Sequence, residues 1–177
     1  MAVTPGSFKI EPMDVTWNGT DLGATEGGVE VSFTEDLVDV VADQEGTRVL
    51  DAIRSGNSVE VSLTLKEMTV ARWSQMFEDA GGGSLTPGGG TEVVGFGKSK
   101  NFTAISTQAA ALTLKPTGSS DDLRNLLFHK AYPIPESISF VGDATEGMSV
   151  SFRVIPDATL ADAIELFVFG DGTQTLT

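Results

Sequence analysis

The chain has 177 residues and no cysteine, and its 25 acidic and 11 basic side chains give a formal net charge of −14. This length suffices for one domain that buries roughly 70% of its unfolded surface, and the lack of cysteine excludes disulfides, thiolate metal sites and a cysteine nucleophile. Because so acidic a surface repels phosphate groups, a protein that grips DNA is disfavoured, whereas a conduit that does not bind its cargo, or simply a well-solvated protein, is compatible with it.

Alternation of apolar and polar residues predicts three long, half-buried antiparallel strands, at residues 28–34, 58–66 and 147–155. Five shorter strands are expected at residues 14–17, 91–96, 111–115, 126–131 and 136–141. Many short strands separated by glycine and asparagine are typical of an antiparallel β-sandwich or barrel. We therefore expect a mainly β fold with one flanking helix, in a single domain over residues 1–177.

One helix is expected after the second long strand. Thr69 fits an N-cap, and three glycines after Ala80 fit the end of the helix. The apolar stripe at helical spacing consists of Val70, Trp73, Phe77 and Ala80. We expect this stripe to cover an open side of the sandwich. Residues 159–167 are a second candidate helix, although residues 165–169 fit a strand equally well.

The segment between the first two long strands, residues 35–57, is unusually long. A hairpin loop normally has two to five residues, whereas this one has ~20. Its apolar side chains are Leu37, Val38, Val40, Val41, Val49, Leu50 and Ile53, and charged residues are interleaved with them. We expect a projecting segment, possessing an apolar side that a partner subunit covers. The alternative is a long strand pair that folds back over the same core.

Four stretches that follow one another along the chain resemble a known protein family. They read LGATEGGVEV at residues 22–31, VADQEGT at 41–47, LDAIRSGN at 50–57 and VEVSLTLKE at 59–67. This arrangement resembles bacteriophage tail tube proteins, in which a glycine-marked turn, a strand, a long projecting loop with an Asp-x-x-Gly-Thr element and a returning strand follow one another. The similarity covers residues 18–67, a little over a quarter of the chain; the remainder agrees only in length, strand-rich pattern and a single mid-chain helix.

The resemblance implies a structural subunit rather than an enzyme, with no cofactor. Tail tube proteins form hexameric rings that stack into a hollow cylinder in the virion, and strands of six subunits close an inner β-barrel through which the genome passes without specific binding. The tubes of contractile tails and type VI secretion machines share this architecture. Assembly in the host cytoplasm, contacts with tape-measure and tail terminator proteins, and no membrane anchor are the corresponding expectations for this chain.

The resemblance also suggests roles for individual residues. The long loop reaches neighbouring subunits and the next ring, so the candidate interface residues are Leu37, Val40, Val41, Asp43, Gly46, Arg48, Leu50, Ile53 and Arg54. If the apolar faces of residues 29–33 and 59–65 meet the core, the opposite faces line the channel. The lumen candidates are Glu30, Ser32, Thr34, Glu60, Ser62 and Thr64. An ordinary solvent-facing sheet would carry the same residue types. Lys66 is expected near a rim or a neighbour.

The sequence contains few residues that could form a catalytic or metal-binding site. The single histidine, His129, is more often a structural group than a general base, and no metal site is expected without cysteine or a second histidine. Two other interpretations are a tail terminator or contractile-system tube protein, and a monomeric β-sandwich module that binds carbohydrate or calcium. Trp17 and the acidic turns at residues 121–122 and 171–173 are the features that such a module would use.

Overall fold

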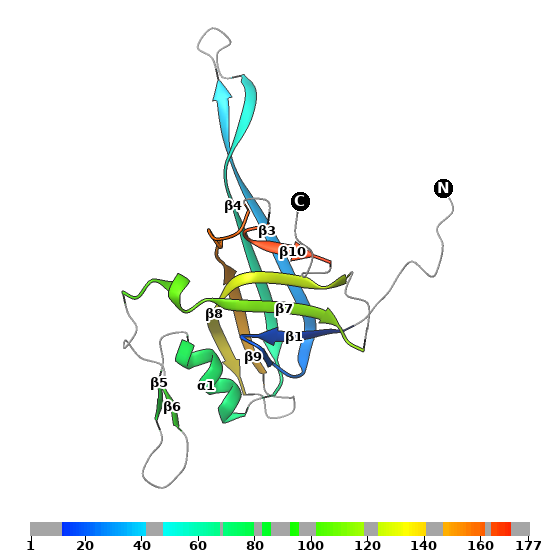
Figure 1. Ribbon diagram of the computed structural model, residues 1–177, viewed down its shortest axis with the longest axis vertical. Helices are drawn as coiled ribbons and strands as arrows, with labels where there is room; N and C mark the ends of the chain where they lie inside the picture. The colour runs from blue at the N-terminus through cyan, green and yellow to red at the C-terminus, as the bar shows by residue number, and fades with distance from the viewer. Residues whose placement is uncertain are drawn as a thin grey trace, which may run out of the picture.

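The computed structural model describes residues 12–41, 48–67, 69–79, 83–85, 93–95, 102–118, 124–140, 147–161 and 164–170. In these residues the protein is mainly β, with one eight-stranded antiparallel sheet, a small two-stranded sheet and one short α-helix (Figure 1). The large sheet contains β1 (Met13–Trp17), β2 (Thr20–Asp21), β3 (Thr25–Val41), β4 (Val49–Leu65), β7 (Ala110–Pro116), β8 (Leu126–Ser139), β9 (Gly147–Val154) and β10 (Phe167–Phe169). The remaining elements are α1 (Val70–Asp79), β5 (Gly83–Leu85), β6 (Val93–Gly95) and the 3-10 turn η3 (Ile105–Thr107).

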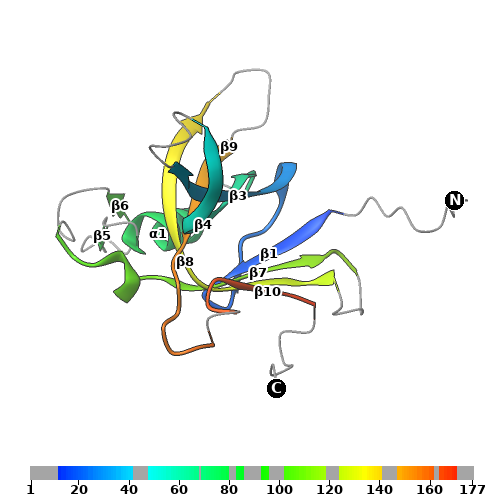
Figure 2. The same ribbon diagram turned by 90° about the horizontal axis from the view of Figure 1, so that it is seen from above.

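The large sheet bends over on itself because β8 belongs to both of its halves. The strand order is β2-β1-β7-β8-β9-β4-β3, and β10 also pairs with β8. The first part of β8 pairs with β7, the second part with β9, so β1 and β7 face β9 and β4 across the core (Figure 2). In the described chain the edge strands β2 and β3 do not pair with each other. The expected sandwich or barrel is therefore one open sheet, which does not close into a barrel in the described chain.

The three long strands predicted from alternation are confirmed, but two of them extend far beyond their predicted ends. β3 and β4 have 17 residues each and pair from Thr25↔Leu65 out to Val41↔Val49. The two strands predicted at residues 126–131 and 136–141 are a single strand, β8, although Pro133 and Pro135 lie within it. Among the described strands, this part of β8 pairs only with β9, so its other edge needs no backbone N–H and tolerates proline.

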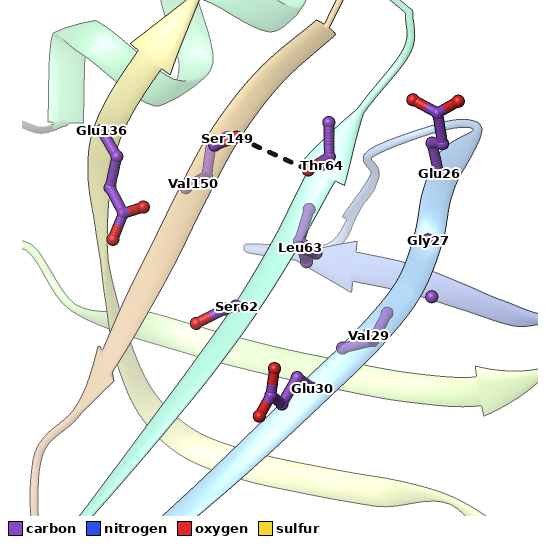
Figure 3. A pocket seen from close by; sticks show the side chains of 11 residues that line it. Glu26, Gly27, Val29, Glu30, Ser62, Leu63, Thr64, Glu136, Ser149 and Val150 are labelled. Atoms are coloured by element: carbon purple, nitrogen blue, oxygen red, sulfur yellow. Dashed lines mark hydrogen bonds between the residues drawn. The ribbon is translucent and has the colours of Figure 1, made fainter.

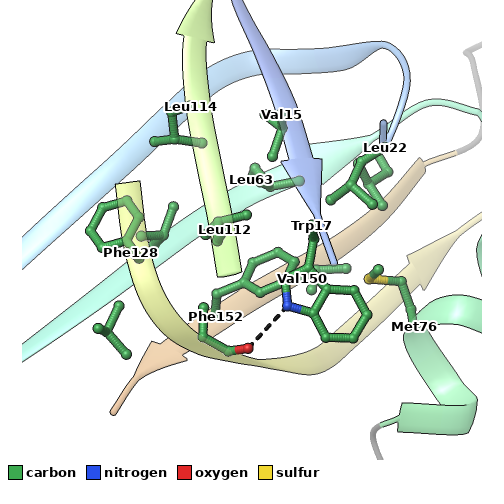
Figure 4. Close-up of a cluster of buried hydrophobic side chains, with 14 of the residues drawn as sticks. Val15, Trp17, Leu22, Leu63, Met76, Leu112, Leu114, Phe128, Val150 and Phe152 are labelled. Atoms are coloured by element: carbon green, nitrogen blue, oxygen red, sulfur yellow. Dashed lines mark hydrogen bonds between the residues drawn. The ribbon is translucent and has the colours of Figure 1, made fainter. Parts of the chain in front are cut away.

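The core lies between the two halves of the bent sheet and contains Trp17, Phe128 and Phe152, all fully buried (Figure 4). The rings of Trp17 and Phe152 lie 6.0 Å apart and thus join β1 to β9. Trp17 Nε1 donates a hydrogen bond of 3.0 Å to the carbonyl of Ala131 in β8. Trp17 is therefore a core residue with its one donor satisfied, and it offers no exposed platform for a sugar.

The predicted helix is confirmed as α1, with Thr69 as its N-cap: the Thr69 hydroxyl accepts a hydrogen bond of 3.3 Å from the Arg72 amide. Its buried face differs from the expected stripe. Met76 is fully buried in the core, whereas Val70, the first residue of the helix, is exposed. Of the two alternatives for residues 159–169, the helix is wrong where the structure describes the segment, because residues 159–160 and 164–166 are turns and bends. The strand is confirmed in part, as β10 at Phe167–Phe169.

Candidate functional site

The outer half of the β3–β4 hairpin projects from the body of the protein (Figure 1). β9 pairs with β4 only from Glu60 to Leu65, so beyond Glu60 the hairpin has no third strand in the described chain. We call the projecting part, residues 34–41 and 48–58, the arm. The described residues of the segment, 35–41 and 48–57, form a two-stranded ribbon that projects from the body, which corrects the sequence interpretation of residues 35–57 as a loop.

Cross-strand contacts give the arm its local order. Val38 faces Ile53 and Val41 faces Val49, and β-branched pairs of this kind stabilise an antiparallel ladder. Near the base of the arm, Glu35 and Arg54 form an ion pair of 2.6 Å, and the Ser55 hydroxyl donates to the carbonyl of Asp36 over 3.1 Å. These contacts satisfy polar groups within the ribbon but bury little apolar surface.

The apolar side chains of the arm are exposed. Leu37 and Ile53 are both 59% exposed, and Val40, the least exposed of the set, is still 36% exposed. The predicted interface residues that belong to the described arm are Leu37, Val40, Val41, Arg48, Leu50, Ile53 and Arg54. Asp43 and Gly46 lie outside the described residues. Of the alternative, a long strand pair that folds back over the same core, the strand pairing is confirmed, whereas the folding back is wrong because these side chains are exposed.

The six lumen candidates share one face of the sheet, on the inner part of β3 and β4. Ladder partners are Glu30↔Ser62 and Ser32↔Glu60, while Thr34 pairs with Ser58 and Thr64 with Glu26. The opposite face of β4 meets the core through buried Val59, Val61, Leu63 and Leu65. Val29 and Val31 pack against that core as predicted, but Phe33 is 58% exposed because it lies where β3 leaves the body.

The same polar face continues onto β9, which the sequence-based candidates omitted. Ser149 stands opposite Thr64, Ser151 opposite Ser62, and Arg153 opposite Glu60. The alternation of residues 147–155 contains the signal for these three residues, but it does not reveal that β9 is the neighbour of β4. The face therefore combines hydroxyls and carboxylates with one arginine.

A hollow of about 310 Å³ interrupts this face near the N-terminal end of β3 (Figure 3). Gly27 and Gly28, both at positive φ, form a two-residue bulge between the pairs Glu26↔Thr64 and Val29↔Leu63. Around the hollow lie the carboxylates of Glu26, Glu30 and Glu136. Glu26 forms an ion pair with Lys66, which places Lys66 at the end of β4 beside the polar face.

Metal binding finds no support in the described residues, where no three His, Cys, Asp or Glu side chains gather in a position to hold an ion. His129 lies in β8, and within the described part of the chain its Nε2 is buried without a hydrogen-bond partner.

A scan of the chain against protein-family models finds no match, and a search of curated proteins finds no significant relative. In the described residues no helix has the length and apolar character required to cross a membrane.

Proposed function

We propose that this protein is a structural subunit that assembles with copies of itself through the arm, and that it forms the tail tube of a bacteriophage. In this proposal it has no enzymatic activity and no cofactor. Subunits join in hexameric rings that stack into a hollow conduit for DNA in the virion, after assembly in the host cytoplasm. Tape-measure and tail terminator proteins are the further partners.

The observation that carries the proposal is the exposed apolar surface of the arm. A two-stranded hairpin is marginally stable by itself in water, and contiguous exposed apolar surface marks contact sites. Val38 and Ile53 are exposed ladder partners on one face of the ribbon and Leu37 is exposed on the other, and no other described part of the chain covers them. A second copy of the chain supplies both cover and additional strand contacts, and it needs no other component.

The open sheet gives independent support for a ring. In the described chain β3 is an edge strand along its whole length, and it carries neither proline nor lysine, two of the devices that protect free edges. Side-by-side assembly of bent sheets around an axis would cover these edges and close a barrel among subunits rather than within one. The tail-tube-like form of the fold is part of the same proposal.

The polar face fits the wall of a conduit. Glu30 and Glu60 repel phosphate, and hydroxyls such as Ser62 offer weak, sequence-independent contacts. Arg153 is a cation on this otherwise acidic and hydroxyl-bearing face. It stands opposite Glu60 in the ladder, so a carboxylate lies beside it. A passing DNA strand would therefore meet little uncompensated positive charge at this position.

The proposal is tested by shortening the arm. Asp36 and Gly56 are ladder partners, so residues 37–55 can be replaced by a two-residue Asn-Gly turn that closes the hairpin at that pair. We expect the full-length chain to form large assemblies in sedimentation velocity runs and the shortened chain to remain a folded monomer with unchanged near-ultraviolet circular dichroism.

A matched pair of full-length variants separates apolar contact from mere arm length. Leu37→Ser with Ile53→Ser removes two exposed apolar side chains, while Asp39→Ser with Asp51→Ser removes two charges from the same ribbon. The double substitution of the apolar residues is expected to raise the critical concentration for assembly at least tenfold. The double substitution of the acidic residues is expected to leave the critical concentration unchanged or to lower it. Assembly of the shortened chain at the full-length concentration would overturn the role of the arm.

A further inference from the structure

The root of the arm is the place where the β3–β4 ladder loses its third strand. The last pair between β4 and β9 is Glu60↔Arg153, and the next ladder pair outward on the β3 side is Phe33↔Val59. From this point on, backbone hydrogen bonds from a neighbouring strand no longer fix the direction of the ribbon in the described chain. Contacts at Phe33 therefore have a large influence on how the arm is held.

Phe33, in β3, contacts Phe167 of β10, a strand near the other end of the chain. The rings of Phe33 and Phe167 lie 5.3 Å apart at 50°, and those of Phe167 and Phe128 lie 5.9 Å apart at 38°. Phe128 is fully buried in the core. Phe167 thus connects the arm root to the core through tilted ring contacts of a favourable kind.

β10 itself is lightly attached. It has three residues, and in the described chain it pairs with β8 alone, from Phe167↔Phe128 to Phe169↔Leu126. A further backbone hydrogen bond of 2.8 Å joins the Gly170 amide to the carbonyl of Asn125. A short strand held on one side opens at a lower free energy than the sheet core.

A bending point lies just beyond the ring contacts. The register shifts between Asp36↔Gly56 and Leu37↔Arg54, so Ser55 is an extra residue in β4. Bulges bend a strand locally, and Gly56 has no side chain to pack against the partner strand. The ribbon can therefore pivot at Ser55–Gly56 when its root is released.

We infer that β10 is a strap that sets the orientation of the arm. While Phe167 is seated between Phe33 and Phe128, the arm root is held to the body; when β10 detaches, the arm pivots at Ser55–Gly56. The coupling is reciprocal, so that holding the arm in place also strengthens the attachment of β10. This inference depends only on contacts within one subunit and holds whether or not the chain forms tubes.

Hydrogen–deuterium exchange of the full-length chain, followed by mass spectrometry of its peptides, tests the strap. Phe167→Ala removes the central ring, and Phe169→Ala is the matched control because Phe169 is in the same strand but 65% exposed. Loss of a ring contact of this type corresponds to about a two- to tenfold faster local opening. We expect this acceleration at residues 33–36 and 56–59 in Phe167→Ala, with residues 61–65 unchanged, and no acceleration there in Phe169→Ala.

Phe33→Ala provides the reciprocal measurement, and it keeps the test decisive if Phe167→Ala unfolds, because Phe33 is more than half exposed and does not belong to the core. Peptides that contain β10 are expected to exchange about two- to tenfold faster in this variant. Unchanged exchange of β10 in Phe33→Ala, or equal acceleration of the arm root in Phe167→Ala and Phe169→Ala, would overturn the inference.

Discussion

The inner and outer halves of the β3–β4 hairpin carry the same types of apolar residue in different surroundings. In the inner half, Val61 and Leu65 are fully buried against the opposite half of the bent sheet. In the outer half, Val38 and Ile53 face each other in the same kind of ladder, yet both are more than half exposed. The two regions therefore differ in what lies over the apolar side chains and not in the side chains themselves.

This difference suggests that one hairpin can contribute both to the stability of the body and, in the proposed assembly, to contacts between copies. The free energy gained by burying apolar side chains is already realised in the body, at about 25 cal/mol per Å² removed from water. In the arm the apolar side chains remain exposed, and in the proposed assembly a neighbouring copy would cover them. Mutations in the two halves should therefore have opposite profiles, with large effects on stability in the body and large effects on assembly in the arm.

The largest effect on stability is expected for Phe152→Ala in the body. Phe152 is fully buried and contacts the ring of Trp17, so truncation leaves a cavity between β9 and β1. We expect a loss of about 3–5 kcal/mol in the free energy of unfolding, measured by urea denaturation with circular dichroism. A loss below about 1 kcal/mol would show that the two halves of the sheet are not packed as described.

Trp17→Phe is expected to have the next largest effect. The substitution keeps an aromatic ring but removes the Nε1 donor, which leaves the buried carbonyl of Ala131 without this hydrogen bond. A loss of about 1–3 kcal/mol in unfolding free energy should follow. Trp73→Phe is the control, because Trp73 is only half-buried on α1, and it should cost less than about 1 kcal/mol. Equal losses in the two variants would contradict the role of the Trp17 hydrogen bond.

A smaller, pH-dependent effect is expected at Asp157, in the loop that leads to β10. The hydrogen bond from Lys130, followed by those from Thr159, lowers the pKa of Asp157 from 3.8 to about 2. A depressed pKa means that this carboxylate stabilises the folded state above pH ~4, and that the contribution is lost as the pH falls toward 2. Asp157→Asn should therefore reduce stability at pH 6, and the difference from the wild type should shrink between pH 4 and pH 2. A difference that stays constant over this range would contradict the assignment.

The smallest effect on stability is expected for Ile53→Ala in the arm. Ile53 is 59% exposed, so its truncation should change the free energy of unfolding by less than about 0.5 kcal/mol. The same variant should raise the concentration at which assemblies appear, measured by light scattering. A loss of stability comparable with that of Phe152→Ala would mean that the arm packs against the body of its own subunit in solution.

Local patterns predicted most of the elements but not their environment. Alternation identified β3, β4 and β9, and Thr69 correctly marked the start of α1, because both signals depend on residues near in sequence. The outer parts of β3 and β4 were expected as a loop, with a strand pair only as the alternative, since charges interleaved with apolar residues such as Val40 and Ile53 hide a simple alternation. The prolines of β8 suggested a break, and only the one-sided pairing of that part of β8 explains why they are tolerated.

The candidate polar face could be predicted in part for the same reason. Glu30, Ser62 and their neighbours follow from alternation within β3 and β4, which are consecutive in the chain. Arg153 and Ser149 join them through the pairing of β9 with β4, which are more than 80 residues apart in the sequence. The exposure of Phe33 likewise depends on where β9 stops, and no local signal encodes that position.

Electron microscopy of the purified full-length chain, concentrated over a series of salt conditions, tests the central claim most directly. We predict hollow filaments built of six-fold rings, with the arm of each subunit packed on a neighbouring copy and the face of Glu30, Glu60 and Ser62 toward the channel. Particles that remain single subunits across the whole series, with the arm uncovered, would contradict self-assembly through the arm.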